Sequence, residues 1–202
     1  MFTIGILASG KGSNAKVLIE EAKTGNIPVR VGLVASDNPD AGALEIARKA
    51  GVPSLYIDPG KYRTFLEVRR ENEYAARLKE HGVQLVCLAG FMRVIKSALL
   101  NAFPNRIINI HPSLLPSFPG IESWKQALDY GVKFTGCTVH FVEAGVDTGP
   151  IILQAVVPVL ADDTPETLHA RIQRKEHLIY PIAVRLIAEG RVSVFGRRVR
   201  IE

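Results

Sequence analysis

Short apolar runs and longer amphipathic stretches alternate along the first half of the chain. Five apolar runs have the length and composition of strands buried on both faces: FTIGILA (2–8), VRVGLVAS (29–36), SLYI (54–57), VQLVCLAG (83–90) and RIINI (106–110). Helical spacing between them predicts helices over 13–25, 43–51, 64–81 and 96–102. Continuous apolar strands separated by helices indicate a parallel sheet. We therefore predict an α/β fold with a doubly wound, mostly parallel sheet and helices on both faces.

The second half of the chain has a different pattern. Its expected elements are a proline-rich loop (111–120), a helix (123–131), two strands (136–142 and 150–159) and a long helix (164–190). The two strands are joined by a connection too short for a helical crossover, so we expect an antiparallel pair. Pro181 is expected to interrupt the long helix. Residues 190–202 would form an edge strand or a mobile tail, and no linker divides the chain, so we expect a single domain over 1–202.

Composition narrows the class of protein. The chain has 202 residues, of which 47% are hydrophobic and 22% charged, as is usual for one globular domain. No apolar run reaches the roughly 20 residues of a membrane-spanning helix, and the N-terminus does not resemble a secretory leader. Cys87 and Cys137 each lie in an apolar run, so we expect buried free thiols. We expect a cytoplasmic protein with no membrane partner.

The charge balance is mildly basic. There are 25 Lys+Arg and 20 Asp+Glu, which gives a net charge of +5. The basic residues are scattered, without a run of five or six and without interleaved aromatic residues, so a nucleic-acid partner is not expected. Small anionic substrates remain compatible with this charge.

The first candidate site follows the first strand. Gly10–Ala15 links that strand to a helix, and its backbone N–H groups can bind an anion such as a phosphate. The loop also matches G-x-G-x-x-A, and Asp37 could bind a ribose, so a dinucleotide site is an alternative. A tight turn with no ligand is a further alternative.

The second candidate site combines two strand ends. Asn109 and His111 lie on the same side of their predicted strand, and two convergent donors suit a developing oxyanion. Asp147 lies between glycines, where it is either a turn former or, if it reaches His111, a carboxylate that holds the imidazole charged. No Cys/His spacing resembles a metal site, and His140 is interpreted as a packed strand histidine.

Several motifs together resemble one enzyme family. ILASGKGSN, LAGFMRVI, INIHPSLLPSFPG, TVHFVEAGVDTGPIILQ and ARIQRKEHLIYP, in this order, are similar to the folate-dependent phosphoribosylglycinamide formyltransferases. This resemblance covers about 3–190. It implies transfer of the formyl group of 10-formyltetrahydrofolate to the glycyl amine of glycinamide ribonucleotide, which gives N-formylglycinamide ribonucleotide and tetrahydrofolate in de novo purine biosynthesis. It implies no metal.

The resemblance also assigns roles to residues. The catalytic residues would be Asn109, His111 and Asp147. The ribonucleotide would be bound by Gly12, Ser13, Asn14, Gln173, Arg174, Lys175 and Glu176. The folate would be bound by Met92, Arg93, Val94, Ile95, Asn109, Glu143, Ala144, Gly145, Val146 and Asp147. An arginine that contacts the folate tail is not assigned among Arg63, Arg69 and Arg70. The implied partners are these small molecules, and the chain would be a monomer or homodimer.

Three alternatives compete with this interpretation. A methionyl-tRNA formyltransferase shares the Asn-His-Asp set, but we expect it to carry a C-terminal tRNA-binding barrel after the last residue here. A 10-formyltetrahydrofolate hydrolase would usually carry an N-terminal regulatory domain. A non-catalytic nucleotide- or NAD-binding module would use the glycine loop and Asp37, and it gives no role to Asn109, His111 and Asp147.

Overall fold

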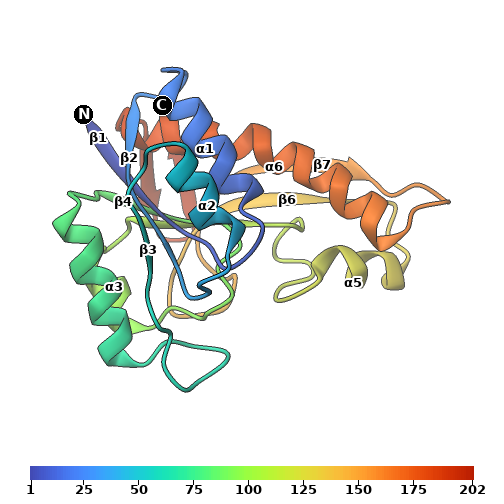
Figure 1. Cartoon of the computed structure of the whole chain (residues 1–202). Helices are drawn as coiled ribbons and strands as arrows, with labels where there is room; N and C mark the ends of the chain where they lie inside the picture. Colours follow the sequence, from blue (N-terminus) through green and yellow to red (C-terminus); the bar gives the residue numbers. More distant parts are fainter. The chain divides into compact units, whose positions relative to one another are not determined.

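The computed structural model describes residues 1–202 and divides the chain into two compact units, Met1–Ile108 and Asn109–Glu202 (Figure 1). Strand β5 (Ile107–His111) begins in the first unit and ends in the second. The main sheet has seven strands in the order β3-β2-β1-β4-β5-β6-β7. A single domain over 1–202 stays a prediction.

The first unit alternates strands and helices. Its elements are β1 (Phe2–Leu7), α1 (Ser13–Lys23), β2 (Val29–Ser36), α2 (Gly42–Lys49), β3 (Ser54–Tyr56), α3 (Val68–Glu80), β4 (Leu85–Leu88) and α4 (Ser97–Ala102). Strand β1 pairs in parallel with β2 and β4, and β2 pairs in parallel with β3. Successive strands are therefore added to one side of β1 (β2, then β3) and then to its other side (β4, then β5), so the direction of the chain across the sheet reverses between β1 and β4. Right-handed crossovers then place α1 and α2 on one face of these strands and α3 and α4 on the other, which agrees with the packing of α1 on α2 and of α3 on α4.

Burial explains why the strands of this unit are continuous apolar runs. Ile4, Ile6, Val34, Leu85 and Val86 have no exposed surface. Burying a side chain of this size contributes about 1.5–3 kcal/mol, and helices on both faces bury both sides of each strand. The α/β class with a mostly parallel sheet, predicted from these runs, is confirmed.

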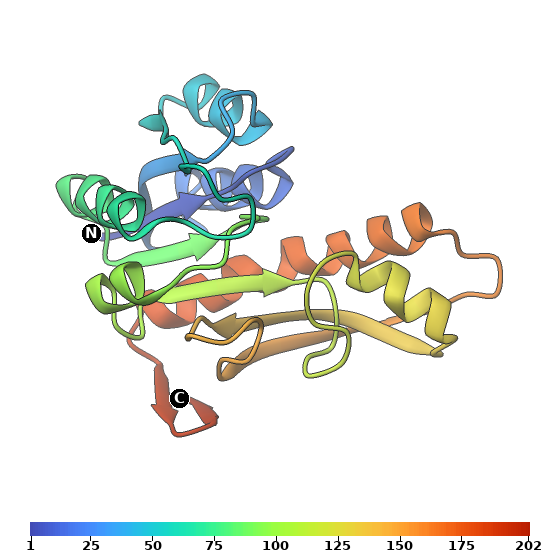
Figure 2. The same ribbon diagram turned by 90° about the horizontal axis from the view of Figure 1, so that it is seen from below.

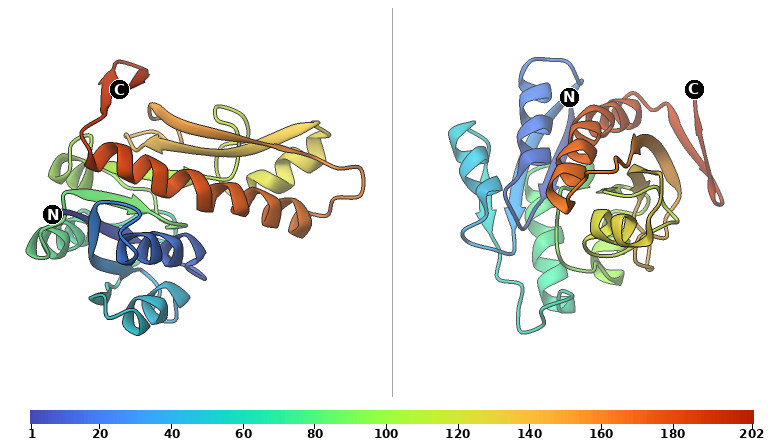
Figure 3. Two further views of the ribbon diagram at one scale, coloured as in Figure 1. Left: turned by 90° about the horizontal axis from the view of Figure 1, so that it is seen from above. Right: turned by 90° about the vertical axis from the view of Figure 1, so that its right-hand side faces the viewer.

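The second unit is built around a strand pair and one long helix. Strands β6 (Phe134–Phe141) and β7 (Ile151–Pro158) are antiparallel, as predicted. Helix α6 (Pro165–Ala188) packs along both strands, and α5 (Ser123–Tyr130) also contacts it (Figure 2). The chain ends in a hairpin of β8 (Val192–Phe195) and β9 (Arg198–Ile201), which extends from the end of α6 (Figure 3).

Helix α6 begins with a complete cap. The Thr164 hydroxyl accepts from the Thr167 N–H, the Thr167 hydroxyl accepts from the Thr164 N–H, and Pro165 occupies the first turn. The expected interruption at Pro181 is wrong. The helix continues through this buried proline to Ala188, because packing on β6 and β7 compensates for one missing backbone hydrogen bond.

Two further expectations are corrected. Helix α3 begins at Val68, not at 64, because Phe65 forms a parallel bridge with Val94 and the Thr64 carbonyl accepts from the Val94 N–H. The last residues do not form an edge strand of the main sheet, because β8 and β9 pair with each other, and the mobility of this segment stays a prediction. No helix in the chain has the length and apolar character required to span a membrane.

Candidate functional site

The first candidate site lies in the first unit, between β1 and β4, where the direction in which successive strands are added to the sheet reverses. The Ser9 N–H donates to the Gly90 carbonyl (3.1 Å) and the Met92 N–H donates to the Ser9 hydroxyl (2.9 Å), so the loops after β1 and β4 are joined. Ligands of open α/β sheets bind at this position, at the carboxyl ends of the strands.

Gly12 gives the loop after β1 its shape. It is the N-cap of α1 with φ +81°, and a Cβ at this position would lie 2.6 Å from Ala43 Cα. Both the left-handed backbone and the close approach to α2 therefore require glycine. Ser13 and Asn14 follow as the first helical residues, where the helix dipole favours an anion. Their role in phosphate binding stays a prediction.

The segment expected to bind folate in this unit contains one engaged arginine. Arg93 Nε lies 2.6 Å from Asp37 Oδ2, and its guanidinium also donates to the Tyr62 carbonyl. Asp37, which the NAD alternative assigns to a ribose, is therefore paired with an arginine. Met92 is exposed and Ile95 is buried in the core, so side-chain contact with a ligand is open to Met92 and not to Ile95.

A buried carboxylate fixes the same segment. Glu71, on α3, has no exposed surface, and it accepts hydrogen bonds from the backbone N–H groups of Lys96, Ala98 (2.9 Å) and Leu99 (3.2 Å). It thus satisfies the first turn of α4 from another helix. Sequence reasoning missed this residue, because a glutamate in a charged helix gives no sign of being buried.

Arg70, one of the three candidates for the folate tail, pairs with Asp58 (2.8 Å) and Glu73 (2.9 Å). Arg63 and Arg69 are exposed. The folate-tail arginine stays unassigned.

The second candidate site is a cluster in the second unit. His111 Nδ1 lies 3.4 Å from Asp147 Oδ2, so the contact on which the catalytic hypothesis depends is present. His111 Nε2 lies 2.9 Å from the Phe118 carbonyl. Because a carbonyl and a carboxylate are both acceptors, an imidazolium with two N–H groups satisfies both partners.

His140 belongs to this cluster, although the sequence predicted for it only a packing role. It is packed on β6, as expected, but its Nε2 also lies 3.2 Å from Asn109 Nδ2. Its Nδ1 donates to the Phe141 carbonyl (2.8 Å), so in the neutral ring Nε2 accepts from the amide of Asn109. Burial lowers the pKa of His140, which keeps the ring neutral. His140 therefore fixes the Asn109 amide with its nitrogen toward the ring, and the second amide N–H can be donated to a substrate oxygen.

The loop between β6 and β7 holds Asp147 in an unusual conformation. Asp147 has φ +53°, and its Oδ2 accepts from the Gly120 N–H at 2.8 Å. A Cβ at Gly149 would lie 1.7 Å from the Phe141 carbonyl oxygen, so the base of the loop closes only with glycine there. Gly149 thus allows the turn to close, and the Asp147 side chain contacts His111.

The proline-rich loop after β5 is also fixed by side chains. The Thr138 hydroxyl donates to the Ser113 carbonyl (2.7 Å) and accepts from the Leu115 N–H (3.1 Å). Gln154 donates to the Leu115 carbonyl and to the Thr138 hydroxyl, both at 3.0 Å. These contacts come from β6 and β7, and no local pattern in the sequence indicates them.

The four ribonucleotide residues expected on α6 differ in exposure. Glu176 is 4% exposed, Gln173 is half-buried, and Arg174 and Lys175 are exposed. Only Gln173 and Glu176, three positions apart, share the inward side of the helix. The four roles stay predictions, as do those of Glu143, Ala144, Gly145 and Val146.

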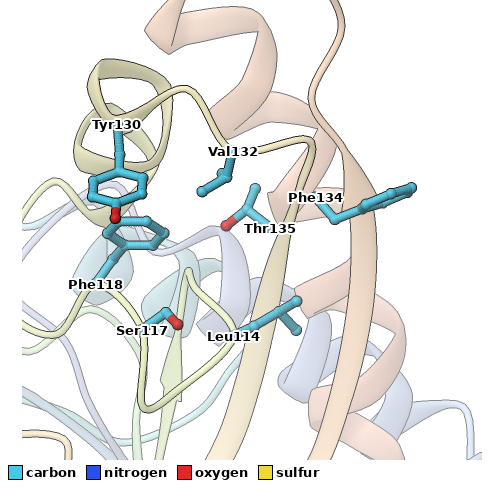
Figure 4. A pocket seen from close by; sticks show the side chains of 7 residues that line it. All are labelled: Leu114, Ser117, Phe118, Tyr130, Val132, Phe134 and Thr135. Atoms are coloured by element: carbon cyan, nitrogen blue, oxygen red, sulfur yellow. The ribbon is translucent and has the colours of Figure 1, made fainter.

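A cavity of about 330 Å³ lies beside this cluster in the second unit (Figure 4). It is lined by Leu114, Ser117, Phe118, Tyr130, Val132, Phe134 and Thr135. None of the proposed catalytic side chains lines it, and its wall is mostly apolar and aromatic. We therefore do not place the reaction there.

The remaining candidates for chemistry are metal-ligating side chains and thiols. No group of three His, Cys, Asp or Glu residues is placed to hold a metal ion. Cys87 and Cys137 are buried and form no disulfide, as predicted, and burial raises the pKa of the Cys137 thiol to about 12. A thiol with such a pKa is a poor nucleophile at neutral pH because little thiolate forms.

Residues 3–184 match the formyl transferase family. The phosphoribosylglycinamide formyltransferase of Bacillus subtilis is 40% identical over 185 residues, which cover 92% of this chain and 94% of that protein. The crystal structure of glycinamide ribonucleotide transformylase 1 from Symbiobacterium toebii has 56% identity and a TM-score of 0.96, and the match covers 100% of this chain and 94% of that one.

A longer relative is also similar. The trifunctional purine biosynthetic protein adenosine-3 of Chironomus tentans is 42% identical over 195 residues, which are 95% of this chain and 14% of that protein. The chain thus spans a small part of the length of such relatives. Together with the family match over most of the chain, these similarities show that the chain belongs to the formyl transferase family, among the phosphoribosylglycinamide formyltransferases.

Proposed function

We propose that the chain transfers a formyl group from 10-formyltetrahydrofolate to the glycyl amine of glycinamide ribonucleotide, in de novo purine biosynthesis. The observation that carries this proposal is the contact of His111 with Asp147 at 3.4 Å, beside Asn109, in a chain of the formyl transferase family. The partners are small molecules, the location is the cytoplasm, and the assembly is a monomer or homodimer.

The reaction begins with attack of the free glycyl amine on the formyl carbon. The carbonyl oxygen becomes an oxyanion, which Asn109 and the His111 imidazolium stabilise by hydrogen bonds. One preorganised donor of this kind contributes about 3–4 kcal/mol to the transition state. In the described conformation His111 Nε2 donates to the Phe118 carbonyl, so the substrate oxygen must replace that carbonyl.

Collapse of the intermediate breaks the bond between the formyl carbon and folate N10. The amine loses one proton overall and N10 gains one, so the proton count balances without a further reactant. Asp147 stabilises the His111 imidazolium and relays the proton toward N10. The neutral His140 holds Asn109 in the orientation that donates.

Binding roles follow the sequence assignments. Gly12, Ser13 and Asn14 bind the phosphate at the N-terminus of α1, and Gln173, Arg174, Lys175 and Glu176 bind the rest of the nucleotide. The folate contacts proposed from the sequence are Met92, Arg93, Val94 and Ile95 in the first unit and Asn109 and Glu143–Asp147 in the second.

An absorbance assay of 10-formyltetrahydrofolate deformylation tests the proposal with three acceptors: glycinamide ribonucleotide, charged initiator methionyl-tRNA, and water alone. Turnover only with the ribonucleotide is expected. Turnover with the tRNA would make the chain a methionyl-tRNA formyltransferase, and turnover in water would make it a hydrolase. No turnover, with binding of NAD, would favour the nucleotide-binding module.

A further inference from the structure

We propose that Arg197, in the C-terminal hairpin, is a positioning residue for the loop that carries Asp147. The hairpin lies beyond residues 3–184, which are those matched by the family. Arg197 follows Gly196 in the turn between β8 and β9. This inference rests on the role proposed for Asp147 and adds a residue from outside the family match.

One guanidinium connects the two ends of the β6–β7 loop. Arg197 Nη1 lies 3.2 Å from Glu143 Oε1 and also donates to the Thr148 carbonyl. Glu143 lies two residues after the end of β6, and Thr148 lies three residues before the start of β7. Figure 2 and the left panel of Figure 3 both show the hairpin beside this loop. The hairpin therefore holds the loop at its base.

The contact to the backbone is the more important of the two. The Arg197 and Glu143 side chains are 69% and 47% exposed, and ion pairs this exposed are screened by water and salt. The guanidinium N–H on the Thr148 carbonyl is a charge-assisted hydrogen bond, and it restrains the main chain of the loop and not a side chain. The bond restrains the peptide group between Thr148 and Gly149. Thr148 directly follows Asp147, the residue that contacts His111.

The conformation of Asp147 makes such a restraint useful. Non-glycine residues rarely adopt φ +53°, so the surrounding structure must hold this backbone. Gly120 and His111 hold the side chain of Asp147, whereas Arg197 holds the neighbouring backbone. Without Arg197 the loop samples more conformations, and the contact of Asp147 with His111 is made for a smaller fraction of the time.

The consequence should be selective for one substrate. The loop is the proposed contact of the formyl donor in this unit, so loosening it raises the KM for 10-formyltetrahydrofolate. The proposed ribonucleotide contacts lie elsewhere in the chain, at Gly12–Asn14 and on α6, so the KM for that substrate should stay constant.

The test compares Arg197→Ala and Arg197→Lys with Arg200→Ala, which removes an exposed arginine of the same hairpin. Hydrogen–deuterium exchange of peptides covering 142–150 is measured without substrate, together with both KM values and the pH–rate profile. We expect Arg197→Ala to speed exchange in the loop and to raise the formyl-donor KM, each by about three- to tenfold. Lysine should restore part of the effect, and Arg200→Ala should behave like the wild type.

Unchanged exchange at 142–150 in Arg197→Ala would overturn the proposal, and so would faster exchange with unchanged donor KM and pH–rate profile. The role of Asp147 is tested separately. Wild-type turnover by Asp147→Asn would remove the proposed catalytic role of Asp147, while the exchange measurement would still decide whether Arg197 holds the loop.

Discussion

Two loops at strand ends are held in place by different means. The loop between β4 and α4 (Ala89–Lys96) is fixed by carboxylates of other elements, Glu71 and Asp37, both buried. The loop between β6 and β7 (Val142–Pro150) is fixed by the side chain of its own Asp147 and by the exposed Arg197.

In the β4–α4 loop the anchoring carboxylate has no catalytic role, whereas in the β6–β7 loop one carboxylate both anchors the loop and can take part in the reaction. Glu71 is saturated by backbone N–H groups and has no exposed surface, so it can only hold structure. Asp147 is 12% exposed and lies 3.4 Å and 3.7 Å from two histidines, so the same carboxylate anchors the loop and can act in proton transfer. Substitutions in the first loop should lower stability, and those in the second should lower turnover.

The largest effect is expected for His111→Ala. Loss of the imidazolium removes a donor to the oxyanion, so turnover should fall by about 10² or more while nucleotide binding stays nearly intact. Steady-state kinetics and calorimetric titration of the ribonucleotide measure the two quantities. His81→Ala, at the end of α3, is the matched control. An unchanged rate would remove His111 from the mechanism.

Asp147→Asn should have the next largest effect. The amide cannot stabilise the imidazolium, so we expect turnover to fall on the order of 10- to 100-fold and the pH–rate profile to change. The pH–rate profile of kcat is the measurement. A profile that coincides with that of the wild type would mean that Asp147 and His111 are not coupled.

Glu71→Gln tests the other loop. The new amide group would face backbone N–H donors, so the free energy of unfolding should fall by about 1–3 kcal/mol. Urea denaturation measures it, with Glu80→Gln on the same helix as the exposed control. If the two variants unfold at the same urea concentration, the buried carboxylate does not anchor α4.

The smallest effect concerns His140 and pH. Burial lowers the pKa of His140 in the folded state. As pH falls below about 6.5, this histidine is therefore protonated in the unfolded chain before it is protonated in the folded one, and the free energy of unfolding decreases. His140→Gln should weaken this loss by about 1 kcal/mol between pH 7.5 and pH 5.5. Thermal unfolding at the two values measures it. Part of the dependence should remain, because burial also lowers the pKa of His177. An equal pH dependence in the variant would show that His140 is not the titrating group.

Local patterns were sufficient for most elements. The apolar run 29–36 is strand β2 at the same bounds. The short connection between the runs 136–142 and 150–159 correctly predicted that β6 and β7 are antiparallel. The errors arose where distant residues intervene. Phe65 pairs with Val94 and delays α3, and packing on two strands carries α6 through Pro181.

The candidate site shows the same limit. Asn109, His111 and Asp147 were identified by their types and their positions at strand ends, and the structure brings Asp147 to His111. His140 was interpreted only as a packed residue, because its bond to Asn109 joins two residues that lie 31 positions apart, on different strands.

The sequence by itself determined the parallel α/β half, the antiparallel pair and the catalytic candidates, because periodicity, turn residues and motif spacing are local properties of the chain. Only the tertiary structure decided which groups support them: Glu71 beneath α4, Arg93 on Asp37, His140 on Asn109 and Arg197 on the Asp147 loop. Each of these contacts joins residues at least 25 positions apart. Such pairings depend on how the elements pack, and no periodicity within one segment records them.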